Sequence, residues 1–234
     1  MIVKAIKTRI FKENEDLNAF ILKYVKNLKD NSVLVVTSKI VALAEGRTAE
    51  YKNKREKIKL IKKESEYALK TKYAWLTIKD GLVMASAGID ESNANGKVVL
   101  LPKDSFKSAE MIRTSLRKKF RIKKLGVIVS DSRIFPLRHG VMGFALGYAG
   151  FQGIKDYVGQ KDIFGRVFKM SKTDVADSLA TSAVLCMGEG SEQKPLAIIT
   201  DAPVVFKNKI NKKELMFGSQ GDLYHPLLKK LKRK

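Results

Sequence analysis

Two strands that are apolar along nearly their whole length constrain the fold of this chain more than any other feature. They are "KLGVIVSDS" at residues 124–132 and "PLAIITDAP" at residues 195–203, and an aspartate stands near the end of each. An apolar run without polar alternation indicates a strand covered on both faces, so helices must pack against both sides of the sheet. We therefore predict a mixed α/β fold in which helices cover an extended mixed sheet.

The rest of the chain alternates further strands with helices. "SVLVV" at 32–36 predicts a strand, and Thr37-Ser38 then open a helical segment that ends at Gly46. The dipeptide Asp80-Gly81 between two apolar runs predicts a β-hairpin turn. Apolar residues at spacings of three and four predict two longer helices, over residues 104–120 and about 173–187.

The last of these helices is expected to end at Gly188, which can adopt the left-handed conformation found after many helices. Its buried stripe is predicted to contain Val175, Leu179, Ala183 and Cys186. On this interpretation Cys186 is a small buried side chain and not a nucleophile.

The domain organisation follows from length and composition. With 234 residues, 44% of them apolar, the chain can bury one large core or two modest ones. We predict a single domain over residues 1–228, with a subdomain insert at about 140–190, a related α/β part near 50–75, and a basic tail at 229–234. The glycine-rich stretch "GVMGFALGYAG" is either a place of close backbone packing or a pair of loops around a short strand.

The charge of the chain is strongly positive. Forty-six Lys and Arg against 24 Asp and Glu give a formal net charge of +22, which favours anionic partners in general. The lysines are scattered and are rarely interleaved with aromatic residues, so a nucleic acid is disfavoured as the partner. A small anionic substrate or a simply lysine-rich surface fits this pattern better.

Cysteine content and hydropathy indicate where the protein works. A single cysteine excludes a disulfide framework within the chain and fits a reducing compartment. The first residues lack the apolar core of a signal peptide, and no run approaches the roughly 18 apolar residues of a spanning helix. We therefore expect a cytoplasmic protein without a membrane partner.

Three acids are candidates for chemistry because each stands just beyond a predicted strand or helix among small residues. They are Asp90 in "GIDESNANG", Asp131 and Glu189. Carboxylate and hydroxyl oxygens suit Mg²⁺ or Mn²⁺, whereas the chain has only two histidines and one cysteine for a zinc site. An acid at such a place also commonly caps a turn or a helix, and sequence alone does not bring the three together.

The sequence contains none of the common nucleotide-binding motifs. The chain lacks a P-loop and a dinucleotide-binding glycine motif, and it lacks the G-x-S-x-G sequence of many hydrolases. A nucleotide would therefore need another device, such as the start of the helix at Ser38 together with the charge of Lys39.

An ordered set of short motifs resembles the coenzyme F420-0 γ-glutamyl ligase family over about residues 30–205. The motifs are "VLVVTSKIVALAEGR", "SAGIDESNA", "LGVIVSDS", "GFALGYAG", "GQKDIFGR", "DVADSLATSAVLCMGEG" and "PLAIITDAP". The resemblance implies a ligase that uses GTP, or ATP, and a divalent metal to couple L-glutamate to a substrate carboxylate through an acyl phosphate. It also implies an intertwined homodimer with two interwoven subdomains.

The resemblance assigns roles to individual residues. Asp90, Asp131 and Glu189 are the residues on which catalysis is expected to depend; Asp90, Asp131 and Ser132 would bind metal, and Glu189 would bind a second metal ion. Contacts with the nucleotide are assigned to Ser38, Lys39, Asn93, Met187, Gly188, Gly190 and Ser191.

The chain departs from the family pattern in three places. Leu43 stands where many relatives have a lysine, and "RIFPLR" at 133–138 replaces a glycine- and tryptophan-containing segment. The segment at 51–75 also bears little likeness to the family. These differences leave the acceptor open between F420-0, a folate glutamate tail and another carboxylate. A non-catalytic homologue that binds nucleotide or nucleic acid is the alternative from another class.

Overall fold

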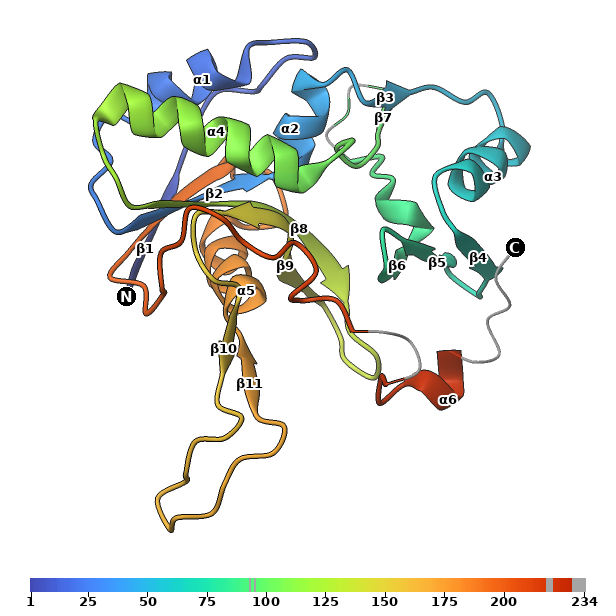
Figure 1. The fold of residues 1–234 in the computed structure, drawn as a ribbon. Helices are drawn as coiled ribbons and strands as arrows, with labels where there is room; N and C mark the ends of the chain where they lie inside the picture. The colour runs from blue at the N-terminus through green and yellow to red at the C-terminus, as the bar shows by residue number, and fades with distance from the viewer. Residues whose placement is uncertain (93, 95, 218–220, 229–234) are drawn as a thin grey trace.

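The structure of the protein is a computed structural model that describes residues 1–92, 94, 96–217 and 221–228. Its centre is a sheet of five strands in the spatial order β1-β12-β2-β8-β9 (Figure 1). The strands are β1 (Ile2–Ile6), β12 (Leu196–Thr200), β2 (Ser32–Thr37), β8 (Leu125–Ile134) and β9 (Val141–Ala149). β2 and β8 run parallel and the other pairs are antiparallel, so the predicted mixed sheet is confirmed.

Helices cover both faces of this sheet, as the apolar strands predicted. The helices α1 (Leu17–Tyr24), α2 (Ser38–Ala44) and α4 (Ser105–Phe120) lie on one face, and α5 (Val175–Met187) lies on the other (Figure 1). Alternate residues of β2 enter two separate cores: Leu34 and Val36 pack on the side of α1 and α4, and Val33 and Val35 pack on the side of α5. Both cores are therefore built on the same strand.

The predicted helices and turns form close to their expected limits. Asp104 accepts a hydrogen bond from the Lys107 amide at 2.8 Å and begins α4, and Gly46 has a positive φ of 62° after α2. Asp80 and Gly81 also have positive φ and join β5 (Trp75–Lys79) to β6 (Leu82–Ala85), so the hairpin is confirmed.

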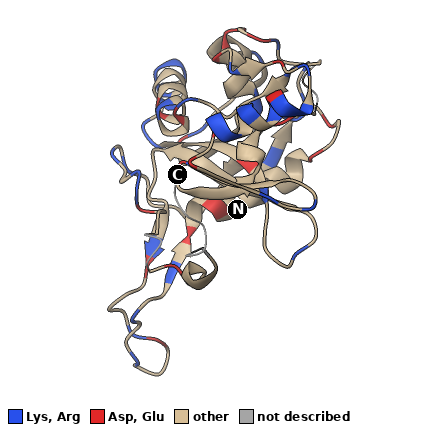
Figure 2. Ribbon diagram, turned by 90° about the vertical axis from the view of Figure 1, so that its right-hand side faces the viewer, with Lys and Arg blue, Asp and Glu red and all other residues tan. Residues whose placement is uncertain are grey.

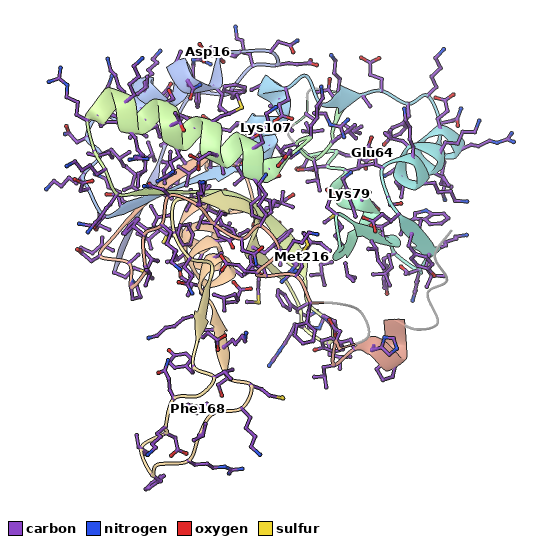
Figure 3. All side chains as sticks on the ribbon, in the orientation of Figure 1. Asp16, Glu64, Lys79, Lys107, Phe168 and Met216 are labelled. Atoms are coloured by element: carbon purple, nitrogen blue, oxygen red, sulfur yellow. The ribbon has the colours of Figure 1, made fainter. Side chains whose placement is uncertain are left out.

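A smaller lobe stands beside the sheet. It contains α3 (Lys54–Lys63) and a three-stranded sheet of β4 (Tyr67–Lys70), β5 and β6, followed by the short helical turn η1 (Ser86–Gly88). Glu64 in this lobe forms ion pairs with Lys79 at 3.2 Å and with Arg47 at 2.6 Å. Figure 3 labels Glu64 and Lys79. The strands β3 (Thr48–Ala49) and β7 (Val98–Val99) pair with each other and connect the lobe to the central sheet.

Residues 140–190, predicted as a subdomain insert, contribute to several parts of the fold. β9 belongs to the central sheet and α5 covers it. Between them, β10 (Ile154–Asp156) and β11 (Lys172–Asp174) form the base of an arm that projects from the body of the molecule, with Phe168 far out on it (Figure 3). The predicted basic tail lies outside the described residues. The last described helix is α6 (His225–Leu228).

The glycine-rich stretch forms a single nine-residue strand, so the expectation of two loops around a short strand is wrong. Close packing does occur, and it lies between elements of the one chain. A Cβ atom at Gly147 would lie 2.5 Å from backbone atoms of Ser105 and Phe106, so only glycine lets α4 approach β9 this closely.

β9 carries one residue more than its pairing with β8 requires. Val129 pairs with Gly147 and Ser130 pairs with Ala145, which leaves Leu146 as the extra residue of a β-bulge. As a result Ala145 and Tyr148 both pack in the core on the α5 side although they are three positions apart. Leu146 packs with Phe144 against Met84 and Leu101, at the smaller lobe.

Charged side chains are distributed over many elements, and Figure 2 shows Lys and Arg on separate helices, strands and loops. Arg113 of α4 is buried, and its guanidinium binds the Leu125 carbonyl, Glu110 and Asn208. No helix in the described part of the chain is both long and apolar enough to cross a lipid bilayer.

Candidate active site

A cavity of about 900 Å³ lies where β2 and β8 reach their carboxyl ends. Its wall combines the N-terminal segment 8–13, the turn from β2 into α2, the loop around Asp90 and the chain after α5. Every predicted site residue that the structure describes lines this cavity, including Ser38, Lys39, Met187, Gly188, Gly190 and Ser191. Asn93 lies outside the described residues.

Asp131 stands at the centre of the cavity wall. It was expected just beyond the strand, but it lies within β8, which continues to Ile134 because the pairing with β9 resumes after the bulge. Burial, together with the negative charges of Asp90 and Glu189, raises the pKa of Asp131 to about 6, although hydrogen bonds from the Ser132 amide and the Ser38 hydroxyl lower it. The Ser132 amide donates to Asp131 Oδ1 at 2.8 Å.

Asp90 is held by a different set of contacts. Its Oδ2 forms an ion pair with Lys39 Nζ at 2.6 Å, and its Oδ1 accepts from the Ser92 amide at 2.7 Å. Burial raises the pKa of Asp90, but the hydrogen bonds from Lys39 and Ser92 outweigh it and leave the pKa below its ordinary value. Asp90 is therefore ionised at neutral pH and already carries a cationic partner.

Glu189 enters the cavity from the end of α5. Gly188 ends this helix with φ of 84°, as predicted, and Glu189 follows it directly. The Ser132 hydroxyl donates to Glu189 Oε2 at 3.1 Å. Because Ser132 and Asp131 are consecutive in β8, they point to opposite faces; Ser132 contacts Glu189 after α5, and Asp131 contacts Ser38 of α2.

The donors in this cavity have the chemistry of a site for a hard divalent cation, because they are carboxylate and hydroxyl oxygens. The raised pKa of Asp131 indicates a surplus of negative charge that a cation would relieve. Across the described ranges, no three His, Cys, Asp or Glu side chains are grouped closely enough to hold a metal ion. The three predicted acids thus share one cavity without forming such a group.

Ser130 is a further candidate for contact with a ligand, and it was not predicted as a site residue. It lines the cavity, it is 1% exposed, and within the described part of the chain its hydroxyl has no hydrogen-bond partner. A buried polar group without a hydrogen-bond partner lowers the free energy of unfolding of the protein. Such a group beside a cavity therefore indicates that a bound ligand supplies the partner. The only signal in the sequence was its place directly before Asp131.

Another set of cavity residues was missed by sequence reasoning. Glu13 accepts from Lys97 Nζ at 2.8 Å and from the Thr48 hydroxyl, and Arg9 and Lys12 line the same cavity. Hydrogen bonds from Lys97 and Thr48 hold the pKa of Glu13 below its ordinary value. These residues come from distant parts of the chain, and no local pattern connects them.

Cys186 corrects one expectation, and the structure shows where residues that depart from the family pattern lie. Cys186 is exposed, because the buried stripe of α5 runs through Ala183 to Met187 at a spacing of four and turns residue 186 outward. Arg133, in the segment that departs from the family pattern, points away to Asp177 of α5, with 3.0 Å between its guanidinium and Oδ2. Leu43 packs at the edge of the core below α2 and also lines the cavity.

Comparison with known proteins gives a consistent result. Residues 5–201 match the family described as F420-0:Gamma-glutamyl ligase. The chain is 34% identical to the coenzyme F420:L-glutamate ligase of Methanococcus maripaludis strain C7, with 96% of this chain and 97% of that protein aligned. It is 31% identical to the protein of the same name from Archaeoglobus fulgidus, with 94% of each chain aligned.

A third relative, the coenzyme F420:L-glutamate ligase of Methanococcus maripaludis strain S2, is 43% identical over 146 residues. This alignment spans 62% of the chain and 58% of the relative, so the chain covers little more than half the length of that protein.

Proposed function

Because the chain belongs to the F420-0:γ-glutamyl ligase family, a family of ligases, we propose that it couples L-glutamate to a carboxylate of a small anionic acceptor of the F420-0 type. GTP, or ATP in its place, supplies the energy in this proposal, with Mg²⁺ or Mn²⁺ as the metal. The observation that carries it is the gathering of Asp90, Asp131 and Glu189 with Ser132 and Lys39 around one cavity.

Asp90, Asp131, Ser132 and Glu189 would hold metal as more than one ion, with Glu189 on the second, because no three acids in the described part of the chain are grouped closely enough to share one ion. When bound, a divalent ion neutralises phosphate oxygens and so lowers the barrier to bringing two anions together. The protein supports this by arrangement: Ser38 and the Ser132 amide orient the Asp131 carboxylate, and the Ser132 hydroxyl orients Glu189.

The reaction has two balanced steps. An oxygen of the acceptor carboxylate attacks the γ-phosphorus of GTP, the bond to the β-phosphate oxygen breaks, and GDP leaves an acyl phosphate. The amine of glutamate then attacks the acyl carbon, inorganic phosphate leaves, and the nitrogen loses a proton as the amide forms. The cavity walls around both steps restrict access of water to the acyl phosphate, which would otherwise hydrolyse.

The size of the cavity and its mixed charge support this division of work. Besides the acids and Lys39, Arg9, Lys12 and Lys97 line the cavity, with Arg9 paired to Glu15 and Lys97 to Glu13. In this proposal the triphosphate lies beside the acids and their metal, and the acceptor and glutamate occupy the rest of the cavity. A folate glutamate tail has the same chemistry as other carboxylate acceptors and remains the alternative substrate.

The test is a product assay with the purified full chain, GTP, Mn²⁺, L-glutamate and F420-0. We expect an acceptor that gains the mass of glutamyl residues, with one phosphate released for each amide formed. Omitting either glutamate or the acceptor should stop phosphate release. Phosphate release that ignores both, or nucleic-acid binding that falls steeply with salt and occurs without turnover, would favour the non-catalytic alternative.

We further propose a homodimer. Support comes from the projecting arm, on which Ile163, Phe164 and Met170 are 91%, 89% and 85% exposed. Apolar side chains at such exposure favour contact with another protein surface. Light scattering should give twice the mass of the chain, and Phe164→Asp together with Ile163→Asp should shift the equilibrium towards the monomer. A monomeric wild-type chain would refute the dimer. The cytoplasmic location stays a prediction.

A further inference from the structure

Lys39, which is predicted to bind the nucleotide, directs its ammonium group to other residues of the protein. The group has three N–H donors, and Lys39 Nζ lies 2.6 Å from Asp90 Oδ2, 3.0 Å from the Ser92 carbonyl oxygen and 3.2 Å from Ser92 Oγ. All of these partners belong to one short segment, 90–92. Ser92 in this segment is 53 positions from Lys39 in the sequence. Lys39 therefore connects the start of α2 to the loop that carries Asp90.

The other hydrogen bonds and ion pairs of this segment, within the described residues, do not reach α2. Asp90 exchanges two backbone hydrogen bonds of 2.9 Å with Val99, the Ser92 amide binds Asp90 Oδ1, and Glu91 binds Tyr51 and Lys57. Val99 pairs in turn with Thr48, which follows α2, so the backbone brings the loop near this helix. Lys39 is the side chain that joins segment 90–92 directly to α2, whose Ser38 binds Asp131.

The same atoms are the ones that the proposed ligands would bind. A divalent cation at Asp90 needs the carboxylate oxygen that Lys39 holds, and it is repelled by the ammonium 2.6 Å from that oxygen. A phosphate, by contrast, attracts the ammonium and can take it from Asp90. Neither ligand alone satisfies both Lys39 and Asp90, whereas a nucleotide and a metal together do.

We propose that Lys39 is a positioning residue that latches segment 90–92 to α2 and exchanges its partners when metal and nucleotide bind together. The inference rests on the proposed function. In the exchange Lys39 passes from Asp90 to a phosphate oxygen, and Asp90 passes from Lys39 to the metal. The nucleotide and the metal thereby raise each other's affinity, since each frees the partner that the other needs.

The latch is weak enough to open. The side chains of Lys39 and Asp90 are 25% and 41% exposed, and ion pairs at such exposure contribute little to the free energy of unfolding. Exchange therefore needs no unfolding of the loop, and the effects of breaking the latch should appear in ligand affinity and not in thermal stability.

The experiment measures Mn²⁺ binding by electron paramagnetic resonance, with and without GDP, and corrects for the Mn²⁺ that GDP binds in solution. We expect Lys39→Met to bind Mn²⁺ alone about 3–10-fold more tightly than the wild type, because the competing ammonium is gone. The same variant should bind GDP about tenfold more weakly and lose most of the mutual enhancement. Lys39→Arg keeps the charge and should restore the weak binding of Mn²⁺ alone.

Lys194→Met is the matched control, because Lys194 lines the same cavity from the chain after α5. A general loss of positive charge would raise Mn²⁺ affinity equally in both methionine variants and would refute the latch. As a second readout, amide hydrogen exchange at Ile89–Ser92 should be faster in Lys39→Met and unchanged in Lys194→Met.

The outcomes separate this inference from the proposed function. If the wild type binds Mn²⁺ and GDP and ligates glutamate, but Lys39→Met leaves the affinity for Mn²⁺ alone within twofold, the latch is wrong and the ligase proposal stands. If the wild type binds neither Mn²⁺ nor nucleotide, both fail.

Discussion

Two groups of acidic side chains in this protein each contain a carboxyl whose pKa is raised, and the two groups differ in their surroundings. Burial raises the pKa of Asp131 to about 6, and it raises the pKa of Asp174, at the start of α5, to about 6 as well. Asp131 lines the large cavity beside Ser130, whose hydroxyl has no partner among the described residues. Asp174 and its neighbour Asp177 do not line that cavity, and Asp177 binds the Ala145 amide and Arg133.

The difference teaches that a perturbed pKa alone does not mark an active site. In the group at α5 the carboxylates accept hydrogen bonds from backbone and side-chain donors. These hydrogen bonds join α5 to β9 and offset the unfavourable burial of the carboxylates. In the cavity the carboxylates leave room for a ligand. The two groups should therefore respond oppositely to substitution, one in activity and the other in stability.

The largest effect is expected for Asp131→Asn. Replacing a carboxylate that would hold the metal by a neutral amide should lower kcat about 10²–10³-fold, or roughly 3–4 kcal/mol. The melting temperature should stay the same or rise, because a buried charge is removed. Steady-state assays of amide formation and thermal scans check the two parts. Asp201→Asn, at an exposed position, is the control and should change neither.

The next effect is expected for Asp177→Ala and falls on stability. The Ala145 amide, 2.9 Å from Asp177 Oδ1, and the guanidinium of Arg133 lose their partner, at a cost of about 2–3 kcal/mol. For a chain of this size the melting temperature should fall by roughly 4–12 °C. Activity of the folded fraction should remain. Ser178→Ala, exposed on the same helix, should stay within about 0.5 kcal/mol. A loss of kcat without a loss of stability would erase the contrast between the two groups.

A third prediction uses the titration of Asp174. Its pKa is about 6 in the folded protein and roughly 3.9 in an unfolded chain, so the folded state binds the proton more strongly. The free energy of unfolding should therefore decrease as the pH rises from about 4 to about 6, and this contribution should be constant above that range. Asp174→Asn keeps the helix cap and removes the titration. The difference between wild type and variant in urea unfolding should fall by roughly 1–3 kcal/mol between pH 4 and pH 7. A difference that does not vary with pH would contradict a raised pKa.

The smallest effect is expected for Ser130→Ala. Removing the unpaired hydroxyl should raise the free energy of unfolding by about 0.5–1 kcal/mol, and the same change should weaken GDP binding about tenfold if the hydroxyl contacts a phosphate. The Ser130 hydroxyl would then lower the free energy of unfolding and raise the affinity for GDP. If Ser130→Ala is destabilised and binds GDP normally, the hydroxyl has a structural partner and does not belong to the site.

The central sheet could be predicted from sequence because its signal is local. The continuous apolar runs at 124–132 and 195–203 indicated strands covered on both faces, and Asp104, Gly46 and Asp80-Gly81 marked helix limits and a turn through their own side chains or backbone freedom. The projecting arm and the bulge in β9 carry no such signal. Both depend on pairing with residues elsewhere in the chain.

The candidate site divides in the same way. Asp90, Asp131 and Glu189 stood out because small residues and glycines surround them, and the family resemblance supplied the roles that pattern alone left open. Glu13, Thr48 and Lys97 were missed because their only relation is spatial. Cys186 was misplaced by one position on the helical wheel, since a stripe with spacings of three and four predicts residues 186 and 187 about equally well.

The extra residue of β9 has a consequence for how related chains can differ in length. Leu146 sets which side chains before it face α5 and which face the smaller lobe, and the amide of Ala145 beside it is the one that Asp177 binds. Inserting one residue between Leu146 and Tyr148 would reverse that alternation for Phe144 and Ala145 together, whereas removing Leu146 would restore regular pairing and keep it. Insertions should therefore be excluded from this part of β9 and accumulate in the outer arm at 157–171, where the bridge between Lys161 and Val167 lies outside the central sheet.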